Sequence, residues 1–553
     1  MFCMVKMREL VSEGVMELGL KSRVEHEEGV ETDLHVSTCF AWLNKYGVAI
    51  CVVGALVALA AYILTLPFGA VTWYDNVVIN EIARGGITHK ALDWSVVATG
   101  NAAADSQSWA TYYIGGWLTE CAYQIGGWLT PKVLLLIVYA LTAVLVFLYA
   151  KRRSGSMPFA AALSLFFFVF PRVAYGVKSG RVDMMALFFV FAALALLAWV
   201  RETRYRLAAL FVSGALGACS VFTWMTAVIA LSALVWEIDD VVRGASRSWR
   251  LRFYGYGAAA VGFLVAAFVF ALPFLMDLGT TLEGLKANLA YNLQGRSGDK
   301  MAQLMVYFKS LVALPGFFLL GAVAIFSRRR FWILAIGFVI FSVFTAMTKA
   351  GTARMIYFIP SMVVALSALV GEQEMRRTVL ARLCMTALGI VMILSYVRMV
   401  ALRTAEDFRY RDRRDVAVVQ EELESVIGRN ASVYTDTFQA YYIGRDLGWK
   451  QYRVGSVKGL DPMPYLAKCD WYLNGWCELD GVTEEQLAEA GFRFEKTVCS
   501  GDEGDKGSAL KYGPYRVYRR VRELGVESGG VESGGVRSGG VKELKVRELR
   551  VGE

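Results

Sequence analysis

Ionisable side chains stand directly beside long apolar runs at three places in the sequence. The residues concerned are Asp75, then Lys178, Arg181 and Asp183, and then Lys349, Arg354 and Tyr357. A charge at a membrane edge is costly unless it is paired or functional, so each place is a candidate site. A single Arg or Lys at the end of a span is equally often an anchor whose charge reaches back to the interface.

If these residues share one depth on one face, four cations and two carboxylates meet there. Such a set suits an anionic headgroup whose lipid tail stays in the bilayer, and a polyprenyl phosphate that carries a sugar has this chemistry. Arg gives forked contacts to phosphate, whereas Lys gives a point charge. When the sugar leaves, these cations stabilise the lipid phosphate. One carboxylate, Asp75, is then enough to accept the proton of the acceptor.

Composition indicates a membrane protein. Of the 553 residues, 56% are hydrophobic and only 19% are charged, which is too apolar for a soluble globular chain. Runs with few or no charges cover 47–71, 132–150, 157–171, 184–200, 207–236, 253–276, 310–327, 331–348, 355–371 and 383–397. The run 207–236 is too long for one span and is expected to break between Ser220 and Thr223. The total is about eleven spans of about 20 residues each.

Short basic loops set the orientation of such a protein. If the spans alternate, one face carries 151–153, 201–206, 243–252, 328–330, Arg376, Arg377 and Arg382. That face is expected to be cytoplasmic, and the three candidate places then lie outside. Six arginines between 398 and 414 oppose this assignment, although charges ahead of a long translocated domain weigh less. No apolar stretch lies in the first forty residues, so the first span is expected to act as its own insertion signal.

Four parts are expected along the chain. They are a disordered cytoplasmic N-terminus (1–45), a transmembrane domain (46–400) with a large outer loop (72–131), an outer α/β domain (401–520) and a disordered repetitive tail (521–553). The tail and the N-terminus are too polar to bury a core. The outer loop contains helical stretches flanked by Trp and Tyr, which suit the headgroup plane.

The outer domain contains alternating strand and helix patterns. The segments SVYTDTF, KCDWYLNG, RFEKTVC and YRVYRRV favour strands, whereas VAVVQEELESVIG and EEQLAEAG favour helices. The fold class predicted is an all-α polytopic membrane protein with a small C-terminal α/β domain. A bridge between Cys469 and Cys477 is possible. The chain has only three histidines, which are too few to favour a metal site with His ligands. No metal or cofactor is expected.

Four short motifs, in this order, resemble the integral-membrane GT-C glycosyltransferases. They are WYDN after the first span, SWATYY in the outer loop, GRVDMMALFF at the start of a span and ARMIYFIP late in the chain. The similarity is to the protein O-mannosyltransferase and aminoarabinose-transferase branch, which takes sugars from polyprenyl phosphate, and it covers roughly residues 46 to 400. It implies that Asp75 is the catalytic residue and that donor contacts come from the other positions. Those positions are Arg181, Asp183, Lys349, Arg354, Tyr357, Tyr112 and Tyr113.

The sequence also departs from this pattern. Asn76 follows Asp75 where many members have a second acid, and Trp109 and Ala110 precede the tyrosines where many have prolines after a lysine. The phosphate contacts of that lysine are therefore either absent or made by other residues, for which Lys178 and the pair His89 and Lys90 are candidates.

The function expected is transfer of a sugar from a polyprenyl-phosphate donor to a lipid, glycan or protein acceptor at the outer face of a bacterial inner membrane. A transporter or flippase of a lipid-linked or anionic solute would use the same cations without breaking a bond. However, the sequence lacks the paired halves with broken midplane helices that many transporters have. A scaffold that only binds lipid phosphate is a third alternative. No nucleic acid partner is expected.

Overall fold

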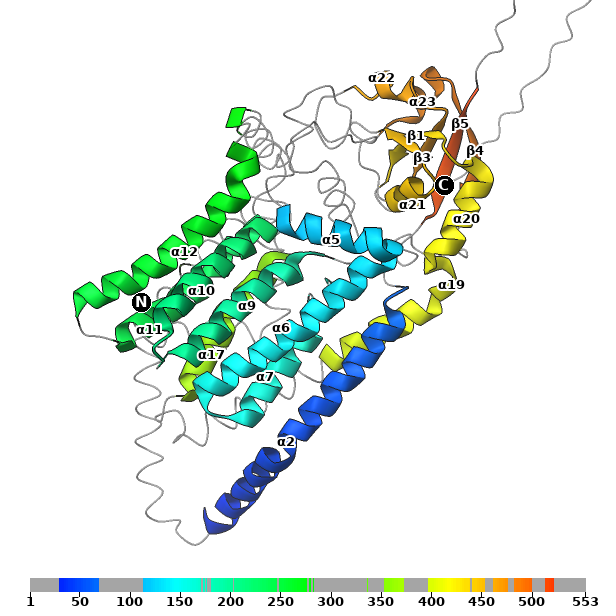
Figure 1. Cartoon of the computed structure of the whole chain (residues 1–553). Helices are drawn as coiled ribbons and strands as arrows, with labels where there is room; N and C mark the ends of the chain where they lie inside the picture. Colours follow the sequence, from blue (N-terminus) through cyan, green and yellow to red (C-terminus); the bar gives the residue numbers. More distant parts are fainter. Residues whose placement is uncertain are drawn as a thin grey trace, which may run out of the picture.

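The structure is a computed structural model, in which residues 29–68, 113–275, 353–371, 396–452, 461–475, 482–499 and 513–521 are described, apart from short gaps and a few single positions. The helical part contains α2 (Gly29–Thr65), α5 (Tyr113–Gly126), η2 (Gly127–Leu129), α6 (Thr130–Ser154), α7 (Met157–Val169), α9 (Asp183–Val200), α10 (Arg206–Thr223), η3 (Met225–Ile229), α11 (Leu231–Ala245), α12 (Trp249–Leu275), η5 (Ala353–Phe358) and α17 (Ile359–Gly371). Most of these helices lie side by side in one layered bundle, whereas α5 lies across one end of it (Figure 1).

Within the described residues, five helical stretches are long and apolar enough to cross a membrane. They are Tyr46–Thr65, Ile114–Ser154, Asp183–Val200, Arg206–Thr223 and Trp249–Leu272. The runs predicted at 310–327, 331–348 and 383–397 lie almost entirely outside the described residues. The membrane class of the fold is therefore confirmed, and the total number of spans stays a prediction.

The break expected inside the run 207–236 is confirmed. Helix α10 ends at Thr223, and Trp224 has an extended backbone with φ −158° and ψ 111°. Helix α11 starts only at Leu231 and continues to Ala245. It therefore runs past the predicted end of the span and occupies part of the segment predicted as a basic loop.

Buried charges explain why α11 is longer than predicted. Glu237 is fully buried and accepts a hydrogen bond of 2.6 Å from the Tyr149 hydroxyl. Asp240 lies 2.9 Å from Arg153 and 2.8 Å from Arg201. The ends of helices α6 and α9 and the middle of α11 therefore share one ion network. This network brings the predicted basic loops 151–153 and 201–206 together at one end of the bundle. Buried charges are tolerated when they are paired in this way.

Two differences concern the predicted boundaries. Helix α2 starts at Gly29, whereas a disordered N-terminus was expected up to residue 45. The segment 29–65 contains no proline, and helix growth is cooperative once a stable apolar section has formed. At the other end, residues 396–409 are helical, so one helix runs across the expected domain boundary at 400.

Glycines allow α10 and α12 to touch backbone to backbone. A Cβ atom on Gly214 would lie 1.9 Å from the Ala259 carbonyl oxygen, and one on Gly262 would lie 1.9 Å from that of Phe211. Small residues at such crossings are typical of helix packing in membranes, where close van der Waals contact replaces the hydrophobic effect.

The C-terminal domain is the small α/β unit that the sequence predicts. Its elements are α19 (Arg411–Arg414), α20 (Val416–Ile427), β1 (Ser432–Asp436), α21 (Tyr441–Asp446), β2 (Lys450–Tyr452), α22 (Met463–Leu466), β3 (Trp471–Asn474), α23 (Glu484–Glu489), β4 (Phe492–Val498) and β5 (Tyr515–Arg520). The sheet order is β2-β1-β3-β5-β4. Strands β1, β2 and β3 run parallel, and β5 pairs antiparallel with both β3 and β4.

The three parallel strands are buried on both faces of the sheet. On one face Val433 and Leu473 pack with α20 and α21, and on the other Tyr434 and Tyr472 pack with α22 and α23. The four predicted strands are all present, and the three-residue β2 was missed. Cys469 is a free thiol that donates to the Tyr465 carbonyl oxygen at 3.2 Å, and its burial raises its pKa.

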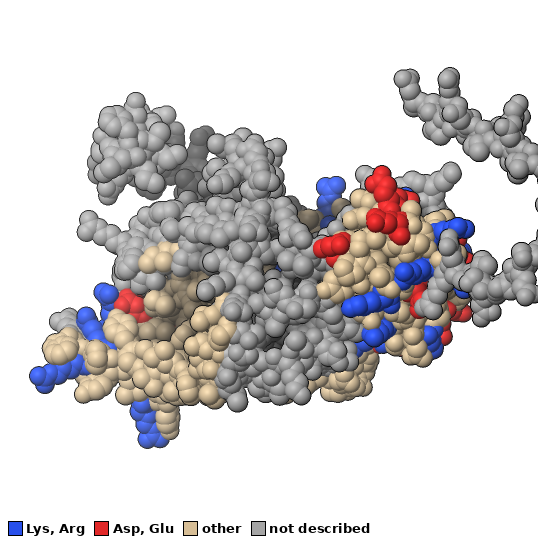
Figure 2. Space-filling view, turned by 90° about the horizontal axis from the view of Figure 1, so that it is seen from above, with Lys and Arg blue, Asp and Glu red and all other residues tan. Residues whose placement is uncertain are grey.

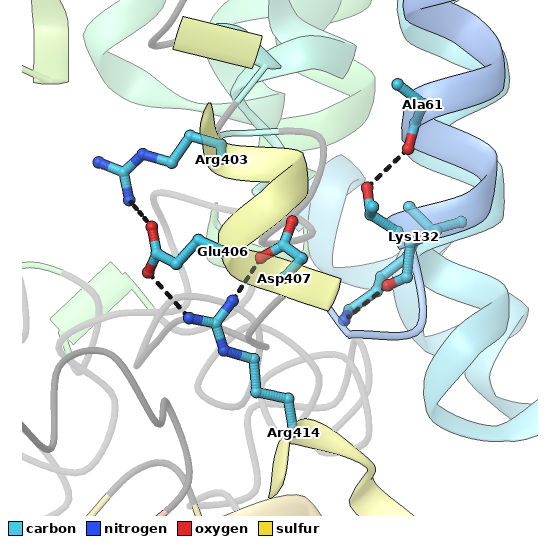
Figure 3. A network of polar contacts seen from close by, with 8 residues as sticks. Ala61, Lys132, Arg403, Glu406, Asp407 and Arg414 are labelled. Atoms are coloured by element: carbon cyan, nitrogen blue, oxygen red, sulfur yellow. Dashed lines mark hydrogen bonds and ion pairs between the residues drawn. The ribbon is translucent and has the colours of Figure 1, made fainter. Parts of the chain in front are cut away.

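A buried arginine joins the helical residues 396–409 to this domain. Arg414 is fully buried; it contacts Asp407 and lies 2.8 Å from Glu406, which also lies 3.6 Å from Arg403 (Figure 3). The arginines that oppose the predicted orientation therefore include two that are paired with carboxylates at this joint.

We expect Arg414→Ala to destabilise the protein by about 3–5 kcal/mol, because it leaves Asp407 buried without its counter-charge. The matched control is Arg411→Ala, since Arg411 pairs with Asp412 at the surface, where an ion pair contributes about 0–1 kcal/mol. Thermal unfolding of the detergent-solubilised full chain measures both. Equal losses in the two variants would mean that the joint does not depend on the buried pair.

Candidate functional site

A buried carboxylate opens helix α9. Asp183 is the first residue of α9 and is only 2% exposed. Its Oδ2 accepts a hydrogen bond of 2.6 Å from Nε of Arg181, whose own backbone N–H donates to the Gly176 carbonyl oxygen at 2.8 Å. An acid in the first turn also suits the positive end of the helix dipole. Arg181 and Asp183 therefore form a fixed ion pair at the start of the helix.

The second oxygen of Asp183 is held by a distant part of the chain. Tyr357, which lies in η5 and is fully buried, donates its hydroxyl proton to Oδ1 at 2.5 Å. The two residues are 174 positions apart in sequence. The structure thus brings together Arg181, Asp183 and Tyr357, which the sequence placed in two separate candidate places.

Trp224 completes this group, and the sequence analysis did not identify it. The Arg181 guanidinium carbon lies 5.5 Å from the centre of the Trp224 ring, within the range of a cation–π contact. The indole N–H donates to the Thr226 hydroxyl at 3.1 Å. The available signal was the break predicted between Ser220 and Thr223, which Trp224 follows directly.

Serine contacts fix the helices that carry these residues. The Ser220 hydroxyl donates to the Ala186 carbonyl oxygen at 2.9 Å and so ties α10 to α9. The hydroxyls of Ser232 and Ser361 lie 3.0 Å apart and tie α11 to α17. The three serine side chains are all buried inside the bundle. The site therefore sits on helices with little freedom to shift, which is what a precise binding geometry requires.

The two members of the ion pair differ in exposure. The Arg181 side chain is 21% exposed and the Asp183 side chain only 3%. Asp183 accepts from Nε of Arg181 and so orients the guanidinium group. A partly exposed guanidinium is a group that suits contact with an anion such as a phosphate.

The remaining predicted site residues are only partly placed. Arg354 lies in η5, one 3-10 turn before Tyr357, and Tyr113 is the first residue of α5. Asp75, Tyr112, Lys178 and Lys349 lie outside the described residues. Among the residues that are described, no three His, Cys, Asp or Glu side chains come together as a metal site.

The site lies at the end of α9 opposite the ion network of Arg153, Arg201 and Asp240. An 18-residue helix separates the two ends, which corresponds to about 27 Å. Viewed from above, charged side chains of both signs gather on the C-terminal domain, whereas the described surface of the helical part is mostly uncharged (Figure 2). This distribution fits a domain in water attached to helices in lipid.

No protein-family model matches the chain, and no curated protein matches it. Among solved structures, it is similar to ArnT from Cupriavidus metallidurans bound to undecaprenyl phosphate, with a TM-score of 0.54 and 13% identity over 86% of this chain and 98% of that one. Two structures of the oligosaccharyltransferase of Archaeoglobus fulgidus also match. The complex with zinc and sulfate has a TM-score of 0.40 and 12% identity over 77% of this chain and 68% of that one. The apo form has a TM-score of 0.41 and 11% identity over 79% of this chain and 70% of that one.

The likeness to ArnT extends over nearly all of that structure and defines the architecture. The chain has a GT-C-type fold, in which a bundle of membrane helices carries a small C-terminal α/β domain. The resemblance drawn from the four sequence motifs is confirmed at the level of the fold.

We expect Tyr357→Phe to destabilise the protein by about 1.5–3 kcal/mol, because Asp183 loses a buried hydrogen bond to a charged group. The control is Tyr396→Phe, whose ring packs on Phe166 and Phe170 and whose hydroxyl has no carboxylate partner among the described residues. Thermal unfolding in detergent compares the two. If both variants lose the same stability, the Tyr357 hydroxyl contributes nothing specific to the site.

Proposed function

We propose that the protein is a glycosyltransferase that moves a sugar from a polyprenyl-phosphate-linked donor to an acceptor on the extracytoplasmic face. The observation that supports this most is the partly exposed Arg181, held by Asp183 and Trp224, in the fold of an ArnT structure bound to undecaprenyl phosphate. An arginine fixed at one end of a membrane bundle suits a phosphate whose lipid chain lies along the helices.

The orientation of the bundle supports the outer location. The basic helix ends around Arg153 and Arg201 lie at the end opposite the site. Loops rich in Lys and Arg stay on the cytoplasmic side, so the site faces the other side of the membrane. For a bacterial chain this is the outer face of the inner membrane.

In the proposed reaction, an acceptor hydroxyl or amine attacks the anomeric carbon of the donor sugar. The bond between this carbon and the phosphate oxygen breaks, and the electron pair leaves with the polyprenyl phosphate. Asp75 accepts the proton that the acceptor loses. Arg181 stabilises the charge that grows on the leaving phosphate, together with the other proposed donor contacts, which are Lys178, Lys349, Arg354, Tyr112 and Tyr113.

Asp183 and Tyr357 have a supporting role in this scheme. Both are buried, and both are within hydrogen-bonding distance of a partner inside the protein. Asp183 fixes the guanidinium of Arg181, and Tyr357 fixes Asp183. A binding group that is held in this way loses little freedom when the donor arrives.

We expect Asp75→Asn to abolish turnover while donor binding persists, because the amide has the same size but cannot accept the proton. The assay supplies polyprenyl-phosphate sugars to the purified protein and follows release of the lipid phosphate. Asp93→Asn, in the same loop, is the matched control and should remain active. A variant at Asp75 that works as fast as the parent would remove it as the base. Binding without any release by the parent protein would favour a lipid transporter.

We expect Arg181→Ala to weaken donor binding by about 1–3 kcal/mol, the value of a charge-assisted contact, and Arg354→Ala to act in the same direction. Titration with undecaprenyl phosphate measures the affinity. Arg204→Ala, at the opposite end of α9 where Arg204 is exposed, should leave the affinity unchanged. Unchanged affinity in all three variants would make Arg181 and Arg354 membrane anchors.

A further inference from the structure

Helix α5 touches the candidate site near its first turn. A Cβ atom on Gly115 would lie 2.8 Å from Cβ of Val182 and 3.1 Å from both of its methyl groups. Val182 is fully buried and stands between Arg181 and Asp183 in the chain. The backbone of α5 therefore packs directly on the residue that links the two members of the ion pair, with no room for a larger side chain.

The other end of α5 is held by the C-terminal domain. The Tyr123 hydroxyl donates a hydrogen bond to Asp446, and the Arg445 guanidinium carbon lies 4.2 Å from the centre of the Tyr123 ring. Both partners belong to α21. Tyr123 is also part of the core that contains Val433 and Leu473, so its ring packs within the α/β domain and not merely against its surface.

The two contacts lie on one face of one short helix. Gly115, Thr119 and Tyr123 follow each other at intervals of four residues, which places them along the same side of a helix. Thr119 is fully buried and donates to the Gly115 carbonyl oxygen at 2.8 Å. The eight steps along the helix from Gly115 to Tyr123 span about 12 Å along the axis. In Figure 1, α5 lies across the end of the bundle with α21 above it.

We propose that α5 positions the Arg181–Asp183 pair, and that the C-terminal domain holds α5 in place through Tyr123. The inference rests on the proposed function, because it concerns binding of the donor phosphate at Arg181. It gives the C-terminal domain a part in donor binding through the contact between Gly115 and Val182. A shift of α5 would move Val182 and, with it, the guanidinium that Asp183 holds.

The first experiment changes the contact with the site. Gly115→Ala forces Val182 to move and should weaken undecaprenyl phosphate binding by about tenfold or more, as small misplacements in preorganised sites do. Gly115→Ala combined with Val182→Gly removes the clashing atoms and should recover much of that loss. Gly257→Ala is the matched control, because a Cβ there meets nothing within 4 Å.

The second experiment changes the contact with the C-terminal domain. Tyr123→Phe removes the hydrogen bond to Asp446 but keeps the ring under Arg445, and Tyr123→Leu removes both. Donor affinity should fall in that order. Tyr518→Phe is the matched control, because it removes a hydrogen bond of 2.9 Å to Glu484 on the opposite face of the same sheet. It should leave the affinity at the parent value.

Thermal unfolding of every variant, measured in parallel, separates positioning from general stability. If the Tyr123 variants lose stability like Tyr518→Phe but bind the donor like the parent, α5 is only a structural support and the proposal is wrong. If Gly115→Ala does not fold, the Tyr123 series still decides. Arg181→Ala separates a failure of the proposed function from a failure of this inference. Unchanged donor affinity in Arg181→Ala overturns the proposed function. Weakened affinity in Arg181→Ala, with parent affinity in the α5 variants, overturns only this inference.

Discussion

Removing the Asp183 carboxylate from water requires that both of its oxygens find partners inside the protein. Arg181 supplies one and Tyr357 the other. This single requirement ties the start of α9 to η5, and the cation–π contact of Arg181 adds Trp224 at the break after α10. Three segments that are far apart in the chain therefore meet at one point, and they hold Arg181 as a fixed, partly exposed group.

Helix α9 separates two polar networks of opposite character. At its start the ion pair of Arg181 and Asp183 retains some contact with solvent, whereas near its end Arg201 shares Asp240 with Arg153. Between them the helix is apolar. Confining charge to the two ends avoids the cost of ionisable groups at membrane depth. The first network has the exposure needed to bind a ligand, and the second neutralises arginines where helices meet.

The C-terminal domain is attached to the bundle in two ways. Its chain connection passes through Arg414, which the carboxylates of Glu406 and Asp407 neutralise. Its second attachment is α5, through Tyr123.

The sequence by itself determined the membrane class, the break after α10 and the longer strands of the C-terminal domain, because apolar length and periodicity are local properties. It did not predict β2, which has only three residues, or the full length of α11, whose acidic residues suggest a solvated loop until Arg153 and Arg201 are beside them. Asp75 and its neighbours lie outside the described residues, so their role stays a prediction. Only the tertiary structure decided which charges meet. Asp183 and Tyr357 are 174 positions apart, and no local pattern encodes contact between groups that helix packing brings together.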